Sequence, residues 1–384
     1  MNGKTILFVH PSDELYGADR CLLELVRGLP PTTRLIAVLP RDLEYTGELS
    51  RELTAAGVAV RDLDFAVLRR DGLRLRYWPA LARRLLAGTW ELAKLARDER
   101  ADVVHTNTLA AVSGPLAACM ARRAHVWHVH EDIRDEAWPI KLAFRMLALL
   151  PGRVIANSRA TATALAGPFG VLHRKTTVVY PGIDTRGRPE PKAASEHAGD
   201  ALRVAFVGRL SPRKGVTELL EAVAHVRDQG IALQLEIFGT APPGQDWREG
   251  QYRRRAEGLG IGDVVRFAGF VADVRRKLTS VDVLVVPSQR PEPFGRVILE
   301  GMAAGCAVVA CRTGGGSDEI IEDGVAGLYC GSEPEEIANA IGRLARDFGL
   351  RARLGAQATA SVQARFSLDA YCNGIMRVYR EMLR

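Results

Sequence analysis

Two carboxylates that stand eight residues apart are the most informative feature of the sequence. Glu292 and Glu300 lie in the segment 287–310, and Pro293 and Gly295 between them prevent one continuous helix. We therefore expect Glu292 on the loop that leaves a strand. Glu300 is expected one turn into the helix that follows.

The beginning of that expected helix would form a site for an anion. The backbone N–H groups of Phe294, Gly295 and Arg296 would have no partner within the helix and would be free to bind a negative group. A loop carboxylate, a helix carboxylate and an anion site between them would suit a sugar, a ribose and a diphosphate. The simpler alternative is a proline-rich turn that carries ordinary surface glutamates.

A second candidate group follows the apolar run 202–207. Arg209 and Lys214 stand five residues apart there, and Gly208 and Gly215 let the backbone turn closely around them. Two solvated basic loop residues are the alternative.

An Asp-x-Asp pair, Asp62 and Asp64, is a candidate for a divalent metal site. It follows a weak strand pattern, and no histidine accompanies it. An exposed strand end explains the pair more simply, so we expect no metal and no cofactor.

Several polar residues of the first half stand where strands are expected to end. His128 and His130 alternate along one strand, with His130 at its carboxyl end and His128 interpreted as structural. Asn107 and Ser158 could line a cleft, although helix capping explains them equally well. Glu131 could contact an acceptor or be an ordinary loop charge.

Short β-branched apolar runs alternate with helical patterns, which is typical of parallel α/β sheets. The 384 residues suffice for two domains, and the Pro-, Gly- and charge-rich stretch 184–200 indicates a linker. We predict domains over 1–185 and 200–366, with a C-terminal helix over 367–384 that packs back on the first. The expected strands are 5–9, 35–39, 103–106, 125–129, 154–156, 177–180, 202–207, 233–238, 264–268, 281–286 and 306–310.

The segment 287–310 is similar to the E-x7-E motif of the retaining family-4 glycosyltransferases, which have the GT-B fold. Further similar segments follow in the family's order, namely VAFVGRLSPRKGVTELLEAV, VRFAGFVADVRRKLTSVDVLVVPS and TGGGSDEIIEDGVAGLY. The first half resembles the family more loosely through ILFVHPSDELYGADRCLLEL, VIANSRATATAL and VVYPGID. The resemblance implies two Rossmann-like, doubly wound α/β domains that face a central cleft.

The resemblance also implies roles for the residues. Arg209 and Lys214 would meet the charge that grows on the diphosphate, while Glu300 faces the ribose and Glu292 the reacting sugar. His130 would lie against the donor sugar, and the residues implied as catalytic are Glu292, His130, Arg209 and Lys214. The implied donor contacts are Gly17, Gly208, Arg209, Lys214, Phe294, Gly295, Arg296 and Glu300. The acceptor-side candidates are Tyr16, Asn107, Glu131 and Ser158.

Two glycine-containing loops carry further expectations. The family usually has two glycines where this chain has Tyr16 and Gly17, so the chain departs from the family's pattern in that loop. The glycines 314–316 precede Ser317, which we expect to cap a helix, and the corresponding family loop closes around the donor.

The expected activity is therefore a retaining transfer of a hexose from a nucleotide diphosphate sugar, with UDP considered before GDP, to a hydroxyl of a sugar or lipid-linked sugar. Cell-surface polysaccharide synthesis is the expected setting. No carboxylate nucleophile is evident, so the family implies front-face attack assisted by the leaving phosphate. The alternatives are glycosylation of a soluble small molecule, a sugar-nucleotide epimerase, and an inactive membrane scaffold.

The positive charge is concentrated in the first half of the chain. The net charge is +7, and residues 1–192 hold 28 Lys and Arg against 21 Asp and Glu. The stretches 69–100 and 138–153 combine Arg with large apolar residues, which indicates contact with an anionic membrane or a helix facing the core. For the membrane contact, the candidate residues are Arg69, Arg70, Arg74 and Arg76. No recognition motif supports nucleic-acid binding.

The remaining features predict a cytoplasmic protein, with the inner face of the membrane as a candidate contact. The apolar run 6–9 is far too short for a signal peptide, and no run is long enough for a membrane span. Six scattered cysteines form neither a disulfide framework nor a zinc site.

Overall fold

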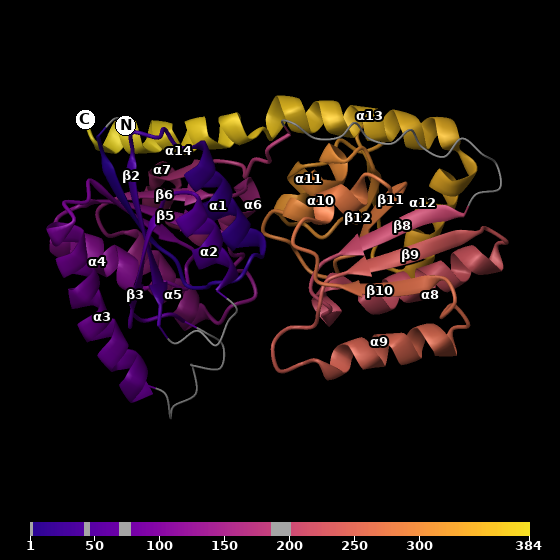
Figure 1. Ribbon diagram of the computed structural model, residues 1–384, viewed down its shortest axis with the longest axis horizontal. Helices are drawn as coiled ribbons and strands as arrows, with labels where there is room; N and C mark the ends of the chain where they lie inside the picture. Colours follow the sequence, from indigo (N-terminus) through magenta and orange to yellow (C-terminus); the bar gives the residue numbers. More distant parts are fainter. Residues whose placement is uncertain (1–2, 42–46, 69–77, 186–200) are drawn as a thin grey trace. The chain divides into compact units, whose positions relative to one another are not determined.

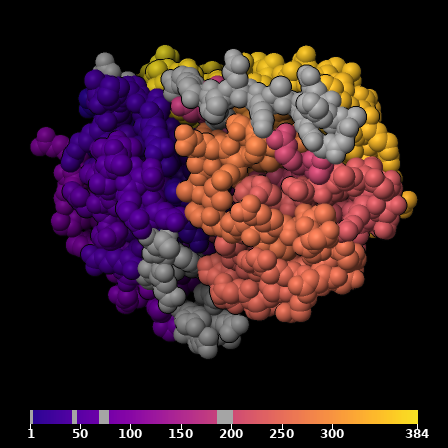
Figure 2. Space-filling model, turned by 45° about the vertical axis from the view of Figure 1, so that its right-hand side comes forward, coloured from indigo at the N-terminus to yellow at the C-terminus, as the bar shows by residue number. Residues whose placement is uncertain are grey.

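The computed structural model describes residues 3–41, 47–68, 78–185 and 201–384. The remaining residues are grey in Figures 1 and 2. The predicted linker 184–200 and the candidates Arg69, Arg70, Arg74 and Arg76 lie wholly or almost wholly outside the described residues. The chain divides into two compact units, which are unit 1, residues 1–184 with 368–384, and unit 2, residues 185–367.

Unit 1 contains a parallel sheet in the order β3-β2-β1-β4-β5-β6-β7. Its strands are β1 (Thr5–Val9), β2 (Arg34–Pro40), β3 (Ala59–Leu63), β4 (Val103–Asn107), β5 (Ala124–Val129), β6 (Arg153–Ala156) and β7 (Thr176–Val178). Its helices are α1 (Gly17–Gly28), α2 (Glu48–Ala55), α3 (Trp78–Asp98), α4 (Ser113–Ala121), α5 (Trp138–Ala148), α6 (Arg159–Ala166), α7 (Gly170–Lys175) and α14 (Leu368–Met382).

Helices cover both faces of this sheet because the central strands are apolar on both sides. In β1, Ile6 and Phe8 pack into a core shared with α1 and α14, while Leu7 and Val9 pack into a core shared with α3 and α4. The yellow helix α14 lies along unit 1 in Figure 1. The C-terminal helix is therefore part of the core that supports β1 and β5.

Unit 2 contains a second parallel sheet in the order β10-β9-β8-β11-β12-β13. Its strands are β8 (Leu202–Val207), β9 (Leu233–Phe238), β10 (Val265–Gly269), β11 (Val283–Val286), β12 (Ala307–Cys311) and β13 (Leu328–Cys330). Its helices are α8 (Val216–Asp228), α9 (Trp247–Gly258), α10 (Val274–Leu278), α11 (Arg296–Ala303), α12 (Pro334–Arg346) and α13 (Phe348–Arg365), with 3-10 turns η3 (Pro212–Lys214) and η4 (Gly316–Glu319).

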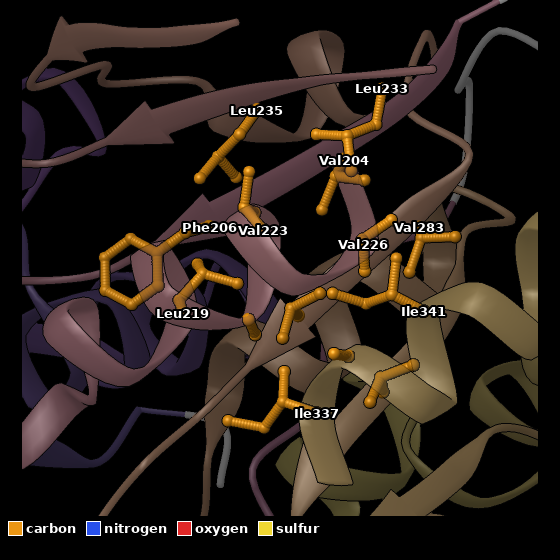
Figure 3. Packing of buried hydrophobic residues seen from close by; sticks show 14 of the residues in the cluster. Val204, Phe206, Leu219, Val223, Val226, Leu233, Leu235, Val283, Ile337 and Ile341 are labelled. Carbon is orange, nitrogen blue, oxygen red and sulfur yellow. The ribbon is translucent and has the colours of Figure 1, made fainter. Parts of the chain in front are cut away.

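The core of unit 2 lies between its central strands and the helix pair α8 and α12. Figure 3 shows Val204 and Val283 of the sheet close to Val226 of α8 and Ile341 of α12. This packing fixes the positions at which β8 and β11 end.

In each sheet the strand order reverses between two central neighbours, β1 and β4 in unit 1 and β8 and β11 in unit 2. Loops that leave the carboxyl ends of such a strand pair diverge, and the crevice between them is where open α/β sheets bind ligands. The loops after β8 and β11 carry the predicted basic residues and Glu292.

The prediction of two parallel α/β sheets is confirmed, and each expected strand is present within a few residues of its predicted bounds. Two edge strands were not among them. The pattern of β3 is weak because its residues are mostly half-exposed, and β13 is just three residues long. Neither strand carries the continuous apolar run that identifies a buried central strand.

Candidate active site

The loop after β8 is held closely against the loop after β11. Gly215 has a φ of 72°, and a Cβ there would lie 1.8 Å from the carbonyl oxygen of Pro287. The N–H of Gln289 donates to the carbonyl oxygen of Arg213 at 2.9 Å. Only glycine allows this approach, which brings η3 beside the residues that precede Glu292.

Lys214, which is partly exposed, forms an ion pair with the buried Glu292 at this junction. Nζ of Lys214 and Oγ of Ser288 each donate to Oε1 of Glu292 at 2.8 Å, and Nη2 of Arg213 lies 3.9 Å from Oε2. Burial alone would raise the pKa of Glu292, but the charges of Lys214 and Arg213 and these hydrogen bonds outweigh it and leave the pKa below its ordinary value. Glu292 is therefore ionised, and it orients Lys214.

Arg209 follows β8 by two residues and is half-buried. The preceding residue, Gly208, packs tightly against Gly239. A Cβ placed on Gly239 would lie 1.9 Å from the carbonyl oxygen of Gly208. The backbone that carries Arg209 is therefore fixed against the loop after β9.

The glycine triplet 314–316 packs against the backbone of Glu292. A Cβ on Gly315 would lie 2.3 Å from the carbonyl oxygen of Glu292, and the N–H of Gly316 donates to that oxygen at 2.7 Å. The expectation that Ser317 caps a helix is wrong. Gly315 precedes the 3-10 turn η4, and Asp318 accepts the N–H of Gly314 at 2.8 Å, so an aspartate organises this loop.

Helix α11 begins as predicted, with Gly295 before its first residue at a φ of 88°. Glu300 is almost fully buried, and its Oε1 lies 3.3 Å from Nε of Arg296 without a hydrogen bond from any described residue. Buried carboxylate oxygens are normally hydrogen-bonded, so this acceptor is suited to a ligand hydroxyl. The side chain of Phe294 is buried against Phe366, which leaves its backbone as the candidate donor contact.

In unit 1 the carboxyl ends of β1, β4 and β5 bring three polar side chains together. Nδ2 of Asn107 lies 2.9 Å from Nδ1 of His10, and Oδ1 of Asn107 lies 2.9 Å from Nε2 of His130. Burial and the nearby His10 lower the pKa of His130 to about 3, against the opposite effect of Asp19. His130 is therefore neutral at physiological pH. His128, interpreted as structural, is fully buried.

Tyr16 and Gly17 open α1 at the same end of the sheet. The N–H of Tyr16 donates to Oδ2 of Asp19 at 2.9 Å, which fixes the first turn. Gly17 is exposed, and a Cβ there would meet no protein atom within 4 Å. The fold itself does not require glycine at this position.

Two acceptor-side candidates use their polar atoms within the fold. Glu131 accepts the N–H groups of Leu109 and His130 at 3.0 Å, and burial raises its pKa despite these bonds. Ser158 is fully buried and caps α6 by accepting the N–H of Thr161 at 3.0 Å. The capping alternative therefore accounts for Ser158.

The Asp62–Asp64 pair has a structural explanation. Asp62 is exposed at the end of β3, and Asp64 pairs with Arg83 at 2.6 Å and Arg84 at 2.8 Å. Throughout the described ranges, no group of three or more His, Cys, Asp or Glu side chains could hold a metal ion.

Four residues of these sites were not singled out from the sequence, namely His10, Asp19, Arg213 and Ser288. His10 and Ser288 come one and two residues after a buried strand, which is the position that a search of strand ends would examine. Arg213 carries no comparable signal, because its partner Glu292 lies far away in the sequence, and Asp19 resembles an ordinary acidic residue in the first turn of a helix.

Two family patterns match this chain. Residues 44–186 match Glycosyltransferase Family 4, and residues 187–361 match Glycosyl transferases group 1. The D-inositol 3-phosphate glycosyltransferase of Streptomyces griseus subsp. griseus is 30% identical over 96% of this chain and 84% of its own length. The enzyme of the same name from Actinosynnema mirum is 36% identical, and the match spans 59% of this chain and 57% of that protein.

Solved structures agree with these matches. HepE of Anabaena in complex with UDP-glucose is 27% identical, with a TM-score of 0.83 over 98% of this chain and 99% of that one. A glycosyltransferase from Rickettsia africae has a TM-score of 0.80 at 19% identity and covers both chains fully, which shows the shared fold.

The fold and the site together define a GT-B glycosyltransferase that uses a nucleotide sugar. The chain belongs to glycosyltransferase family 4, a family of retaining enzymes, as its E-x7-E motif predicted. Each helix in the described part of the chain is too short or too polar to cross a lipid bilayer.

Proposed function

We propose that unit 2 binds a UDP-sugar and that the enzyme transfers the sugar, with retention, to a hydroxyl of a sugar or lipid-linked sugar. The observation that carries the proposal is the meeting of Lys214, Ser288 and Glu292 at the point where the order of the second sheet reverses. The complexes of HepE with UDP and UDP-glucose support uracil as the base of the donor.

Arg209 and Lys214 stabilise the negative charge that develops on the diphosphate as the sugar leaves. The fixed pairing with Glu292 keeps the Lys214 ammonium in place before the donor binds, so little reorganisation is needed during the reaction. The backbone N–H groups at the start of α11, around Phe294, Gly295 and Arg296, add partial positive charge. A divalent metal is unnecessary in this arrangement.

Glu300 accepts hydroxyls of the ribose through its buried, unsatisfied Oε1. Glu292 serves the reaction on the sugar side and orients Lys214. No carboxylate nucleophile is assigned, so attack on the face of the leaving phosphate, assisted by that phosphate, is the proposed route.

Unit 1 contributes Gly17 and His130 to the donor and Tyr16 and Asn107 to the acceptor side. The open space at Gly17 supports close approach of the diphosphate to the backbone of α1. Glu131 and Ser158 act there through the loops they hold together.

A second acceptor, an inositol phosphate, is favoured by the relatives. The proteins from Streptomyces griseus and Actinosynnema mirum are both called D-inositol 3-phosphate glycosyltransferase. A phosphorylated acceptor is also consistent with the excess of basic residues in the first half of the chain.

The experiment is a donor and acceptor matrix, with UDP- and GDP-sugars against inositol 3-phosphate, simple glycosides and a lipid-linked sugar. We expect UDP release only when an acceptor is present, a product of retained anomeric configuration, and unchanged rates in EDTA. Conversion of the donor without any acceptor would indicate an epimerase and contradict the proposal. Absence of binding by every nucleotide sugar would contradict it as well.

We also propose that unit 1 contacts an anionic membrane at the inner, cytoplasmic face through α5. Trp138, Leu142 and Met146 stand four residues apart on this helix with exposed fractions of 73%, 38% and 43%. The helix contains Lys141 and Arg145 and no acidic residue. An exposed apolar stripe with flanking cations is the arrangement of an interfacial helix.

Co-sedimentation with lipid vesicles tests this contact. Trp138→Ser should weaken binding to anionic vesicles at low salt, and Trp247→Ser is a matched control because Trp247 is 59% exposed on α9 of unit 2. Equal losses for the two variants, or equal binding to neutral vesicles, would contradict docking through α5.

A further inference from the structure

A chain of four polar side chains ends at His130. Nε2 of His10 lies 2.6 Å from Oδ1 of Asp19, Nδ1 of His10 lies 2.9 Å from Nδ2 of Asn107, and Oδ1 of Asn107 lies 2.9 Å from Nε2 of His130. The first three residues are buried, and they come from the carboxyl ends of β1 and β4 and from α1. Apart from the contact of Asn107 with the acceptor, no step of the proposed reaction uses them.

The direction of the hydrogen bonds along this series of side chains follows from Asp19. Burial raises the pKa of Asp19, but the hydrogen bonds from His10, Ser12 and Tyr16 outweigh it and leave the pKa below its ordinary value. An ionised carboxylate only accepts hydrogen bonds, so Nε2 of His10 must carry a proton. Nδ1 of His10 then accepts from the NH2 group of Asn107, which lies 2.9 Å away.

The amide of Asn107 has an independent anchor. Its Nδ2 also lies 3.4 Å from the carbonyl oxygen of Ala18, which can only accept. The NH2 group therefore faces His10 and Ala18, and the amide oxygen faces His130. An oxygen in that position requires a proton on Nε2 of His130.

The other ring nitrogen of His130 is left as an acceptor. Its Nδ1 makes no hydrogen bond with any described residue, and the residue as a whole is partly exposed. The ring of His128 lies 4.1 Å away between centroids and is itself held neutral by burial, which lowers its pKa. A neutral ring with a lone pair at Nδ1 attracts hydroxyl groups and repels phosphate oxygens.

We propose that Asp19, His10 and Asn107 are positioning residues that hold His130 in its Nε2–H form, so that Nδ1 accepts a hydrogen bond from a hydroxyl of the transferred sugar. This inference rests on the proposed function for the identity of the ligand. It assigns His130 to a hydroxyl of the sugar and excludes it from the diphosphate.

Nitrogen NMR of the unliganded protein tests the polarity without any substrate. In protein labelled with 15N at its histidine rings, with His130→Gln to assign the signals, we expect an unprotonated Nδ1 and a protonated Nε2 at His130 from pH 5 to 8. A protonated Nδ1, or a doubly protonated ring in that range, would overturn the proposal. A failure of the proposed transferase function would leave this spectrum as predicted, so the two can be told apart.

A matched pair of substitutions tests the positioning role. Gln at position 10 can donate to Asp19 and accept from Asn107, whereas Leu can do neither. His10→Leu should mix the two neutral forms of His130 and lower kcat/KM about tenfold, the value of one hydrogen bond, while His10→Gln should restore most of this loss and keep the Nε2–H form. An unchanged His130 spectrum and kcat/KM in His10→Leu would overturn the inference. If His10→Leu does not fold, the wild-type spectrum decides alone.

Discussion

Replacing Lys214 by Met should separate two contributions of this residue, one to stability and one to catalysis. The substitution leaves the ionised Glu292, whose side chain is 7% exposed, without its nearest cation. Breaking a buried ion pair costs about 3–5 kcal/mol when no other group compensates. Ser288 at 2.8 Å and Arg213 at 3.9 Å remain, so we expect a loss of about 2–3 kcal/mol.

The dependence on pH gives the sign of this effect. The pKa of Glu292 is below its ordinary value of 4.5 in the folded protein, so the stability that the pair contributes is present above about pH 4.5 and disappears as the pH falls through the folded pKa. Urea unfolding at pH 7 and pH 4 should therefore show a smaller difference between wild type and Lys214→Met at the lower pH. An equal difference at both would refute the reasoning.

A double variant separates stability from catalysis. In Lys214→Met with Glu292→Gln the buried charge is absent, so stability should return to within about 1 kcal/mol of wild type. The rate should stay low, because a preorganised cation lost from the diphosphate costs roughly 2–4 kcal/mol in the transition state. Recovery of both stability and turnover would show that Lys214 only neutralises Glu292. No loss of stability in the single variant would show that the pair contributes nothing.

Further measurements concern Gly17, the two glutamates of the motif and His125. Gly17→Ala should leave the unfolding curve unchanged and raise KM for the donor, because its Cβ would meet no protein atom; lost stability with normal kinetics would contradict this. In calorimetry and steady-state assays, Glu300→Gln should mainly weaken donor binding and Glu292→Gln should mainly lower kcat, and equal effects on affinity alone would count against separate roles. Burial and the charge of Lys175 lower the pKa of His125 to about 3, so below pH 6.5 only the unfolded chain takes up this proton. This residue should therefore cost about 2 kcal/mol of stability between pH 7 and pH 5, and in urea unfolding His125→Gln should reduce the pH dependence by about that amount. His105, His128 and His130 should retain their own share of the dependence.

The sequence was sufficient to predict where the two carboxylates of the motif lie. Pro293 and Gly295 end one element and begin the next, so Glu292 falls on a loop and Glu300 on α11 for local reasons. The central strands were predictable for a similar reason, since a strand buried on both faces leaves a continuous apolar run.

The contacts within the sites depend on sheet order, which local patterns do not reveal. Lys214 and Glu292 are 78 residues apart and meet only because β8 and β11 are neighbours. His10 and Asn107 are 97 residues apart and meet because β1 pairs with β4. Ser317 misled the helix-cap prediction because the glycine loop is shaped by Glu292 and Asp318.

Calorimetric titration with UDP and with UMP, in EDTA, tests the central claim most directly, because the two ligands differ by the phosphate assigned to Arg209 and Lys214. We predict that UDP binds the wild type at least tenfold more tightly than UMP. In Arg209→Ala and Lys214→Ala that preference should shrink, while UMP binds as before. Equal affinity of the wild type for the two nucleotides, or a preference for UDP that appears only after Mg²⁺ or Mn²⁺ is added, would contradict a diphosphate site built from these two cations.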